Sequence, residues 1–215
     1  MLAATESVAL IGTEAHLVQV EVDVSIGVPK LTFVGLPAIS VREAEQRMRS
    51  ALQSSGERWP PHRMVANLAP AALRKEGTHF DLPMAIGIVA ADGRLEASAL
   101  KGWVIVGELA LDGSVRPVRG TLAAAISCRT EGRRGVICPA GNAGEAQLVD
   151  GIEIVPVSTL QQCLDFLRGK CAAPPFPPST PITNDYIEDM RDVRGHARPK
   201  KALEIAAAGG HNVLL

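Results

Sequence analysis

An uninterrupted alternation of apolar and polar side chains, in the run HLVQVEVDVSI from His16 to Ile26, most constrains the fold of this chain. Successive side chains of a β-strand point to opposite faces, so every second residue shares a face. One face of this run is entirely aliphatic: Val18, Val20, Val22, Val24 and Ile26. The pattern therefore predicts a half-buried antiparallel strand that lies with one face on a hydrophobic core.

Turn residues and shorter apolar patterns divide the rest of the first 170 residues into further elements. Strands are expected at residues 30–34, 63–69, 103–109, 115–118, 136–139 and 153–157. Helices are expected from residue 40 to Gly56 and at residues 81–91, 121–130, 142–149 and 158–168. The antiparallel first half and the alternating strands and helices of the second half predict an α+β domain, with helices packed on a mixed sheet.

Three of these helices carry residues typical of an N-terminus. Ser40 with Glu43 and Ser158 with Gln161 have the spacing of capping boxes, and Asp81 is expected to be an N-cap. The first helix also has a charged face with two pairs spaced for i,i+4 contact, Glu43–Arg47 and Glu45–Arg49. We interpret that face as solvated, because its glutamates interrupt any basic track.

Composition limits the functional class. Of the 215 residues, 47% are apolar and only 3% aromatic, so the core must be built from aliphatic side chains. A net charge of −1 gives no general sign of nucleic-acid binding. The four cysteines show no C-x-x-C spacing and are expected to be buried thiols in a reducing cytosol. Neither a signal peptide nor a membrane-spanning stretch is evident, so we expect a cytoplasmic protein without membrane partners.

A proline-rich segment, AAPPFPPSTP from Ala172 to Pro181, marks the clearest boundary. Proline donates no backbone hydrogen bond, so this segment should be an extended linker. We therefore expect a first domain at residues 1–170, a linker at 171–184 and the start of a second domain at 185–215.

The last segment, from Asp192 to Leu215, reads as a helix followed by a strand. Pro199 suits the first helical position, and Gly209-Gly210 supplies a stop. Residues 212–215 are apolar enough for a buried strand. In P-loop ATPases such a strand leads into a G-x-x-x-x-G-K-S/T loop, a pattern that occurs nowhere in the 215 residues.

The run ALEIAAAGGHNVLL, from Ala202 to Leu215, resembles the entry to the AAA+ ATPase module of the ComM/YifB family of bacterial magnesium-chelatase-like ATPases. The resemblance implies a hexameric motor that uses ATP and Mg²⁺ in the full-length protein and acts on DNA in branch migration during natural transformation. It places Val193, Arg194 and Gly195 against the adenine of ATP. Without the phosphate loop, we expect no cofactor on this fragment.

The first domain resembles the proteolytic domain of Lon in two stretches, RKEGTHFDL from Arg74 to Leu82 and VGELALDGSVRPVRGTLAA from Val106 to Ala124. In the active relatives these stretches carry a serine nucleophile and a lysine base. The corresponding positions here are His79 and Leu122. Leucine cannot accept a proton, and loss of one member of such a dyad removes most of the rate. The resemblance therefore implies a non-catalytic scaffold that serves assembly or the binding of DNA or a partner, with no catalytic residues.

Alternatives remain open. A rewired dyad of Thr78 and Lys75 is conceivable, but its offset from the helix start differs from that of the active enzymes. His79 lacks neighbours spaced as metal ligands, so we expect a structural role and no metal site. The full-length protein could instead be a protein-remodelling ATPase of the magnesium-chelatase type, an active Lon-type peptidase or an adaptor that binds only protein partners.

Overall fold

The computed structural model describes residues 1–176 and 189–214, apart from the side chain of Arg42. The chain divides into two compact units, Met1–Pro178 and Ser179–Leu215. Most of the expected linker, residues 177–184, lies outside the described residues. The two units are described separately below.

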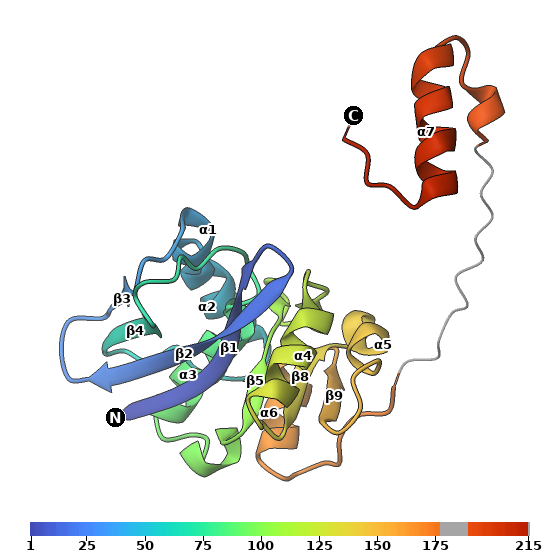
Figure 1. The fold of residues 1–215 in the computed structure, drawn as a ribbon. Coiled ribbons are helices and arrows are strands. Elements are labelled where there is room, and N and C mark those ends of the chain that lie inside the picture. The colour runs from blue at the N-terminus through green and yellow to red at the C-terminus, as the bar shows by residue number, and fades with distance from the viewer. Residues whose placement is uncertain (177–188, 215) are drawn as a thin grey trace. The chain divides into compact units, whose positions relative to one another are not determined.

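The first unit is built on a seven-stranded mixed sheet, which confirms the predicted mixture of parallel and antiparallel strands (Figure 1). The strand order is β3-β4-β2-β1-β5-β8-β9. Pairing is antiparallel between β1 and β2 and between β2 and β4, and parallel elsewhere. The strands are β1 (Leu2–Ile11), β2 (Glu14–Ser25), β3 (Lys30–Val34), β4 (Arg63–Ala69), β5 (Trp103–Ile105), β8 (Gly135–Pro139) and β9 (Glu153–Val157).

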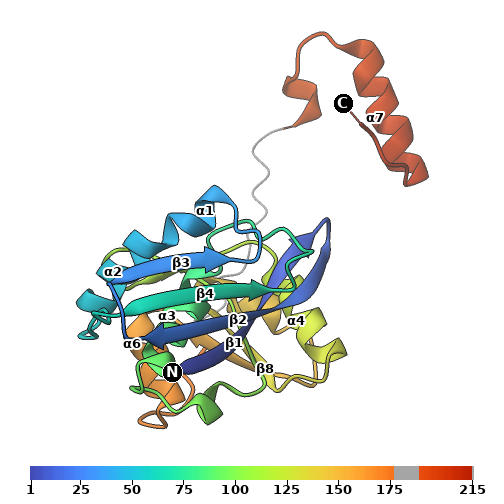
Figure 2. The same ribbon diagram turned by 90° about the vertical axis from the view of Figure 1, so that its left-hand side faces the viewer.

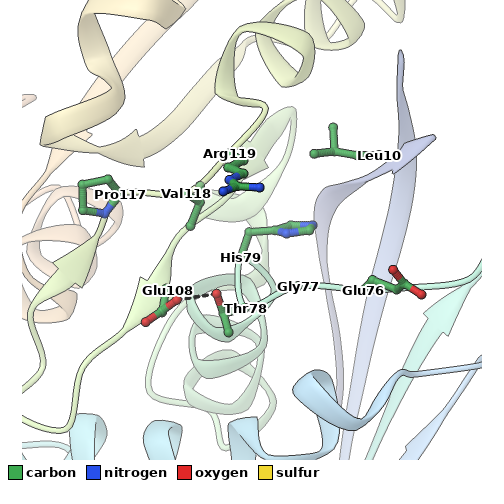
Figure 3. Close-up of a pocket in the computed structure, with 9 residues that line it drawn as sticks. All are labelled: Leu10, Glu76, Gly77, Thr78, His79, Glu108, Pro117, Val118 and Arg119. Carbon is green, nitrogen blue, oxygen red and sulfur yellow. Dashed lines mark hydrogen bonds between the residues drawn. The ribbon is translucent and has the colours of Figure 1, made fainter. Parts of the chain in front are cut away.

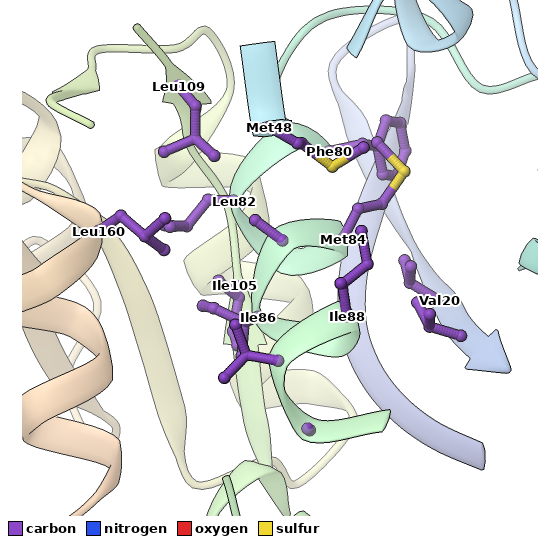
Figure 4. Close-up of a cluster of buried hydrophobic side chains, with 14 of the residues drawn as sticks. Val20, Met48, Phe80, Leu82, Met84, Ile86, Ile88, Ile105, Leu109 and Leu160 are labelled. Atoms are coloured by element: carbon purple, nitrogen blue, oxygen red, sulfur yellow. The ribbon is translucent and has the colours of Figure 1, made fainter. Parts of the chain in front are cut away.

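Helices cover both faces of this sheet. The helices are α1 (Ile39–Arg42), α2 (Ala44–Ser54), α3 (Asp81–Ala91), α4 (Thr121–Thr130), α5 (Ala143–Ala146) and α6 (Leu160–Leu167). Side chains of α2, α3 and α6 join the larger hydrophobic cluster (Figure 4). All eleven residues of α3 are buried. Side chains of α4 and α5 join a second cluster. Within β5, Ile105 belongs to the first cluster and Val104 to the second, so the sheet separates two cores.

The alternating run forms β2 as predicted, with Val18, Val20 and Val22 fully buried. The prediction that Ile26 shares this buried face is wrong, because the strand ends at Ser25 and Ile26 is 96% exposed. The sequence pattern also missed β1. Its middle residues are buried on both sides of the sheet, so its side chains do not alternate cleanly between apolar and polar.

Three predicted caps are wrong. The first helix begins at Ile39 and breaks at Glu43, and the Ser40 hydroxyl accepts the Gly77 N–H instead. Asp81 is the first residue of α3, and its carboxylate turns to another helix. The cap of α6 lies one residue later than predicted, because Thr159 rather than Ser158 is the N-cap. The Thr159 side chain accepts the Gln162 N–H, and the Gln162 side chain accepts the Ser158 N–H.

Further elements are shorter than expected. The strand predicted at 103–109 breaks after Ile105, and β6 (Glu108–Leu109) pairs with β7 (Val115–Arg116). The strand predicted at 115–118 ends at Arg116. The helix predicted at 142–149 is a 3₁₀ turn at Ala140–Asn142 followed by α5. A second 3₁₀ turn, at Ala97–Leu100, precedes β5. Within the described residues, no helix is long and apolar enough to cross a membrane.

The second unit holds a 3₁₀ turn at Met190–Asp192 and α7 (Ala197–Gly209). Pro199 is the third helical residue rather than the first, while Gly210 ends the helix with φ of +63° as expected. The predicted strand does not form at residues 212–214, because no described strand lies beside it to complete hydrogen bonds, and Leu215 lies outside the described residues.

Candidate functional site

An open cleft of about 510 Å³ lies where the loop before α3 meets the segment between β6 and α4 (Figure 3). Its walls come from three parts of the first unit: the end of β1, residues 76–79 and residues 108–119. The lining residues are Leu10, Glu76, Gly77, Thr78, His79, Glu108, Pro117, Val118 and Arg119. The two stretches that resemble Lon therefore come together around one cleft.

Backbone hydrogen bonds hold the two stretches in register. The Gly107 N–H donates to the His79 carbonyl at 3.0 Å, and the Leu82 N–H donates to the Gly107 carbonyl at 3.0 Å. Gly107 sits where a side chain has no room, since a Cβ there would lie 2.9 Å from Val115 Cγ1. These two hydrogen bonds hold the start of α3 against the residue that precedes β6.

Thr78 and Glu108 form the polar contact across the cleft. The Thr78 hydroxyl donates to a Glu108 carboxylate oxygen (Figure 3). The other carboxylate oxygen lies 3.5 Å from Arg116 Nη1. Glu108 thus holds the Thr78 hydroxyl with one carboxylate oxygen and faces Arg116 with the other.

His79 is buried at the position that the Lon resemblance assigns to the nucleophile. Its Nε2 lies 2.8 Å from the Val8 carbonyl, which can only accept, so Nε2 carries the proton. Burial lowers the pKa of His79, and the ring is neutral at neutral pH. Gly77 before it has φ of +96°, and a Cβ there would lie 2.9 Å from His79 Nδ1. The ring thus ties the loop to β1, as expected of a structural histidine.

The other expected catalytic position, Leu122, does not line the cleft. It packs against the second hydrophobic cluster from the first turn of α4. The side chain at position 122 therefore does not reach the cleft and supplies no base there.

A rewired Thr78–Lys75 dyad is not assembled either. The buried Lys75 ammonium donates to the Pro70 carbonyl, and burial lowers the pKa of Lys75. The Thr78 hydroxyl is directed to Glu108 instead. A nucleophile and its base must share a hydrogen bond, and these two side chains are held by different partners.

One buried ion pair beside the cleft was missed by the sequence analysis. Arg47 Nε donates to Asp81 at 2.6 Å, and Arg47 Nη2 donates to the same carboxylate at 3.0 Å and to the Ser40 carbonyl at 3.0 Å. The Leu109 N–H also donates to Asp81, at 3.3 Å. Burial raises the pKa of Asp81 to about 6, although Arg47 opposes that shift. The expected solvated charged face is therefore wrong at Arg47, which turns inward.

The predicted adenine-contacting residues lie in the second unit. Val193, Arg194 and Gly195 are exposed in the turn before α7, and Gly195 has φ of +72°. The Lys200 ammonium donates to the Val193 carbonyl and closes the turn onto the helix. Their role in nucleotide binding stays a prediction.

Metal ligands do not gather in the described part of the chain. Residues 1–176 and 189–214 contain no group of three or more His, Cys, Asp and Glu side chains placed to hold a metal ion. Of the cysteines, Cys128, Cys138 and Cys163 are buried as expected, whereas Cys171 is exposed.

Comparison with known proteins gives two family matches and close relatives. Residues 20–142 match the family described as subunit ChlI of Mg-chelatase, and residues 189–215 match magnesium chelatase, subunit ChlI.

The chain is 42% identical over 207 residues to the uncharacterized protein YifB of Escherichia coli K12, covering 96% of this chain and 41% of YifB. It is 42% identical over 221 residues to competence protein ComM of Haemophilus influenzae Rd, covering 99% of this chain and 43% of ComM. An uncharacterized protein of Mycobacterium tuberculosis H37Rv is 37% identical over 209 residues, which cover 97% of this chain and 42% of that protein. The chain thus spans about two fifths of the length of these relatives.

Proposed function

Since the chain belongs to the ComM/YifB family of Mg-chelatase-like proteins, we propose that it is the N-terminal part of an ATP-dependent AAA+ motor that acts on DNA. The observation that carries this proposal is the match to competence protein ComM along 99% of the chain. In the full-length protein a ring of six subunits would bind ATP and Mg²⁺ and drive branch migration during natural transformation. The ring would assemble through the ATPase module.

The first domain acts in this proposal as a non-catalytic scaffold of the Lon type. Its support is geometric. The two Lon-like stretches meet around one cleft, yet His79 is hydrogen-bonded to the backbone of β1 and Leu122 packs against the second hydrophobic cluster. A serine-type mechanism needs a hydroxyl and a base in contact. The cleft offers Thr78 with a carboxylate that is already paired to Arg116.

The ATPase rate of the full-length protein, measured with and without branched DNA, tests the motor function. Forked or four-way DNA should stimulate hydrolysis strongly, and unbranched duplex of equal length and concentration is the matched control. Equal rates with branched DNA, unbranched duplex and no DNA would contradict action on DNA. They would favour the protein-remodelling alternative below.

Cleavage of an unfolded casein substrate tests the loss of peptidase activity. We expect no cleavage above the rate of a Thr78→Ala variant, whose remaining cleft is unchanged. Cleavage that disappears in Thr78→Ala would show that Thr78 and Glu108 form a working catalytic pair, and the scaffold proposal would be wrong.

Nucleotide contact by Val193, Arg194 and Gly195 is part of the same proposal. The exposed turn and the positive φ of Gly195 support it, because a residue without a side chain lets the backbone come close to a planar ring. Arg194→Ala in the full-length protein should raise the KM for ATP. Arg191→Ala, three residues upstream in the preceding 3₁₀ turn, is the control and should leave KM unchanged.

A protein-remodelling ATPase of the magnesium-chelatase type is the second candidate. One specific observation favours it: both matched families carry the name of the magnesium-chelatase subunit. ATP hydrolysis that is indifferent to DNA but rises with a porphyrin-metallating partner would support this candidate over the DNA motor.

A further inference from the structure

One edge of β1 loses its partner strand where β1 reaches the cleft. Along its first edge, β1 pairs with β2 from Leu2 to Ile11 (Figure 2). Its second edge pairs with β5 only at Glu6, which lies opposite Val104. β5 ends at Ile105, whereas β1 continues to Ile11. Within the described residues, the last part of β1 therefore has a partner strand on one side only.

The hydrogen-bond pattern of β1 decides which backbone groups face this second edge. Met1, directly before β1, exchanges two backbone hydrogen bonds with Val24 of β2, so these two residues form a hydrogen-bonded pair. Such pairs alternate along an antiparallel ladder, and the odd-numbered residues of β1 therefore bond to β2. The even-numbered residues turn their N–H and C=O groups to the second edge. Val8 agrees with this pattern, because its carbonyl oxygen lies 2.8 Å from His79 Nε2.

Leu10 is the even-numbered residue of β1 that lines the cleft. Its N–H and C=O have no hydrogen-bond partner within the part of the chain that the structure describes. Leu10 lies on the opposite side of the cleft from Glu108 and Pro117 (Figure 3). The cleft volume of about 510 Å³ is in the range of clefts that hold a ligand. An unpaired strand edge at the wall of such a cleft binds an extended backbone.

The charges of the cleft indicate which extended backbone fits. Both acidic side chains that line it already face a cation, since Glu76 lies 2.6 Å from Arg74 and Glu108 lies 3.5 Å from Arg116. Arg119 also lines the cleft and is exposed. Its guanidinium has no hydrogen-bond or ion-pair partner within residues 1–176 and 189–214. The cleft therefore holds one cation that a carboxylate of a ligand can meet.

We propose that the cleft binds an extended acidic peptide segment of a partner protein, which adds to the edge of β1 at Leu10 and places a carboxylate at Arg119. One residue of the peptide exchanges two backbone hydrogen bonds with Leu10. Nucleic-acid phosphates could also meet Arg119, but they only accept hydrogen bonds and cannot donate to the Leu10 carbonyl. The inference rests on the scaffold role proposed above for the first domain, and it names the class of partner that this scaffold binds.

Phage display of short random peptides on the 215-residue chain supplies the probe. The enriched peptides should share an acidic residue, and the most enriched one is then synthesised with a fluorescent label for anisotropy titrations. Arg119→Gln should weaken its binding about fivefold. Arg129→Gln, at an exposed arginine of α4, is the matched control and should change nothing. A peptide whose acidic residue is replaced by its amide should bind the native chain and Arg119→Gln equally.

Methylation of single backbone nitrogens of the peptide tests the strand contact. Methylating the peptide N–H that pairs with Leu10 should weaken binding at least about tenfold, because that hydrogen bond is lost and the methyl group meets the edge of β1. Methylating the two neighbouring nitrogens should have little effect, since their N–H groups point away from β1. This alternation distinguishes an added strand from a peptide that is held by its side chains alone.

Amide hydrogen exchange, followed by NMR, locates the contact on the chain. Exchange of the Leu10 N–H should slow at least about tenfold in the complex, because it gains an acceptor. The N–H of Gly151, exposed in the turn before β9, is the control and should exchange at an unchanged rate.

The inference is overturned if no peptide is enriched, if methylation shows no alternation, or if the Leu10 and Gly151 amides respond alike. It is also overturned if labelled single-stranded DNA, rather than any peptide, binds in a manner that Arg119→Gln abolishes. Mass spectrometry of the peptide after incubation separates this inference from the scaffold role. Cleavage that Thr78→Ala abolishes would refute the scaffold role, whereas an intact peptide that does not bind would refute this inference alone.

Discussion

Replacing Arg47 by methionine should leave a buried negative charge without its cation. Asp81 is fully buried and accepts two hydrogen bonds from Arg47, and only the Leu109 N–H remains among its described partners after the change. Breaking a buried ion pair from one side costs about 3–5 kcal/mol, more than the loss of the packing of an arginine stem. We therefore expect Arg47→Met to lower the free energy of unfolding by about 3–5 kcal/mol at pH 7.5.

The effect should depend on pH with a defined sign. Burial and the nearby Glu108 raise the pKa of Asp81, whereas Arg47 lowers it. The resulting pKa is about 6 in the folded protein, compared with 3.8 for an exposed aspartate. A raised folded pKa stabilises the protonated folded form, so this stability is complete below about pH 4 and is lost as the pH rises through 6. Without Arg47 the pKa rises further. The cost of Arg47→Met should therefore fall to about 1 kcal/mol at pH 5, where Asp81 is neutral.

Urea unfolding followed by tryptophan fluorescence, from the buried Trp103 and the half-buried Trp59, measures these values. The double variant Arg47→Met, Asp81→Asn removes the stranded charge and should recover most of the stability at pH 7.5. Arg74→Met breaks the exposed Arg74–Glu76 pair, which spans 2.6 Å, and should cost less than about 1 kcal/mol.

Two outcomes would refute this reasoning. The first is an equal cost of Arg47→Met at pH 5 and pH 7.5, which would show that lost packing rather than charge governs the change. The second is a double variant as unstable as the single one, which would show that the two side chains are not coupled.

Two further predictions concern the first unit. Gly35→Ala should cost at least about 2 kcal/mol in urea unfolding, because Gly35 has φ of +93° and a Cβ would lie 2.1 Å from the Leu68 carbonyl oxygen. Gly144→Ala is the control: it lies in α5 with no atom within 4 Å of a Cβ, and it should stabilise the protein by about 0.5–1 kcal/mol. Native thiol titration should find one fast thiol, Cys171, because burial raises the pKa of Cys128 to about 11 and of Cys138 to about 12. Fast reaction of a buried cysteine would show that its core opens.

Local patterns predicted the elements that bury one regular face. The valines of β2 at positions 18, 20, 22 and 24 are buried as their spacing indicates. The end of α7 at Gly210 also follows from the sequence alone, since few other residues adopt positive φ. The mixed character of the sheet followed from the order of the elements.

Contacts between distant segments escaped prediction because no local pattern records them. Ser40 and Asp81 both have side chains suited to helix caps, yet each bonds to a partner more than thirty residues away. The cap preference of Asp81 is worth about 1 kcal/mol, which its charged contact with Arg47 exceeds. In the same way, the sequence assigned Leu122 to the position of the lysine base, but only the tertiary structure showed that its side chain packs against the second hydrophobic cluster.

The amino-acid sequence by itself determined the family of this chain, the alternation that builds β2 and the absence of a serine–lysine pair at positions 79 and 122. Only the tertiary structure decided that the two Lon-like stretches enclose one cleft and that Arg47 pairs with Asp81 inside the protein. The physical reason is that periodicity and residue type report which face of an element is apolar. Hydrogen bonds, ion pairs and strand order depend on which segments meet, and that is settled only when the whole core packs.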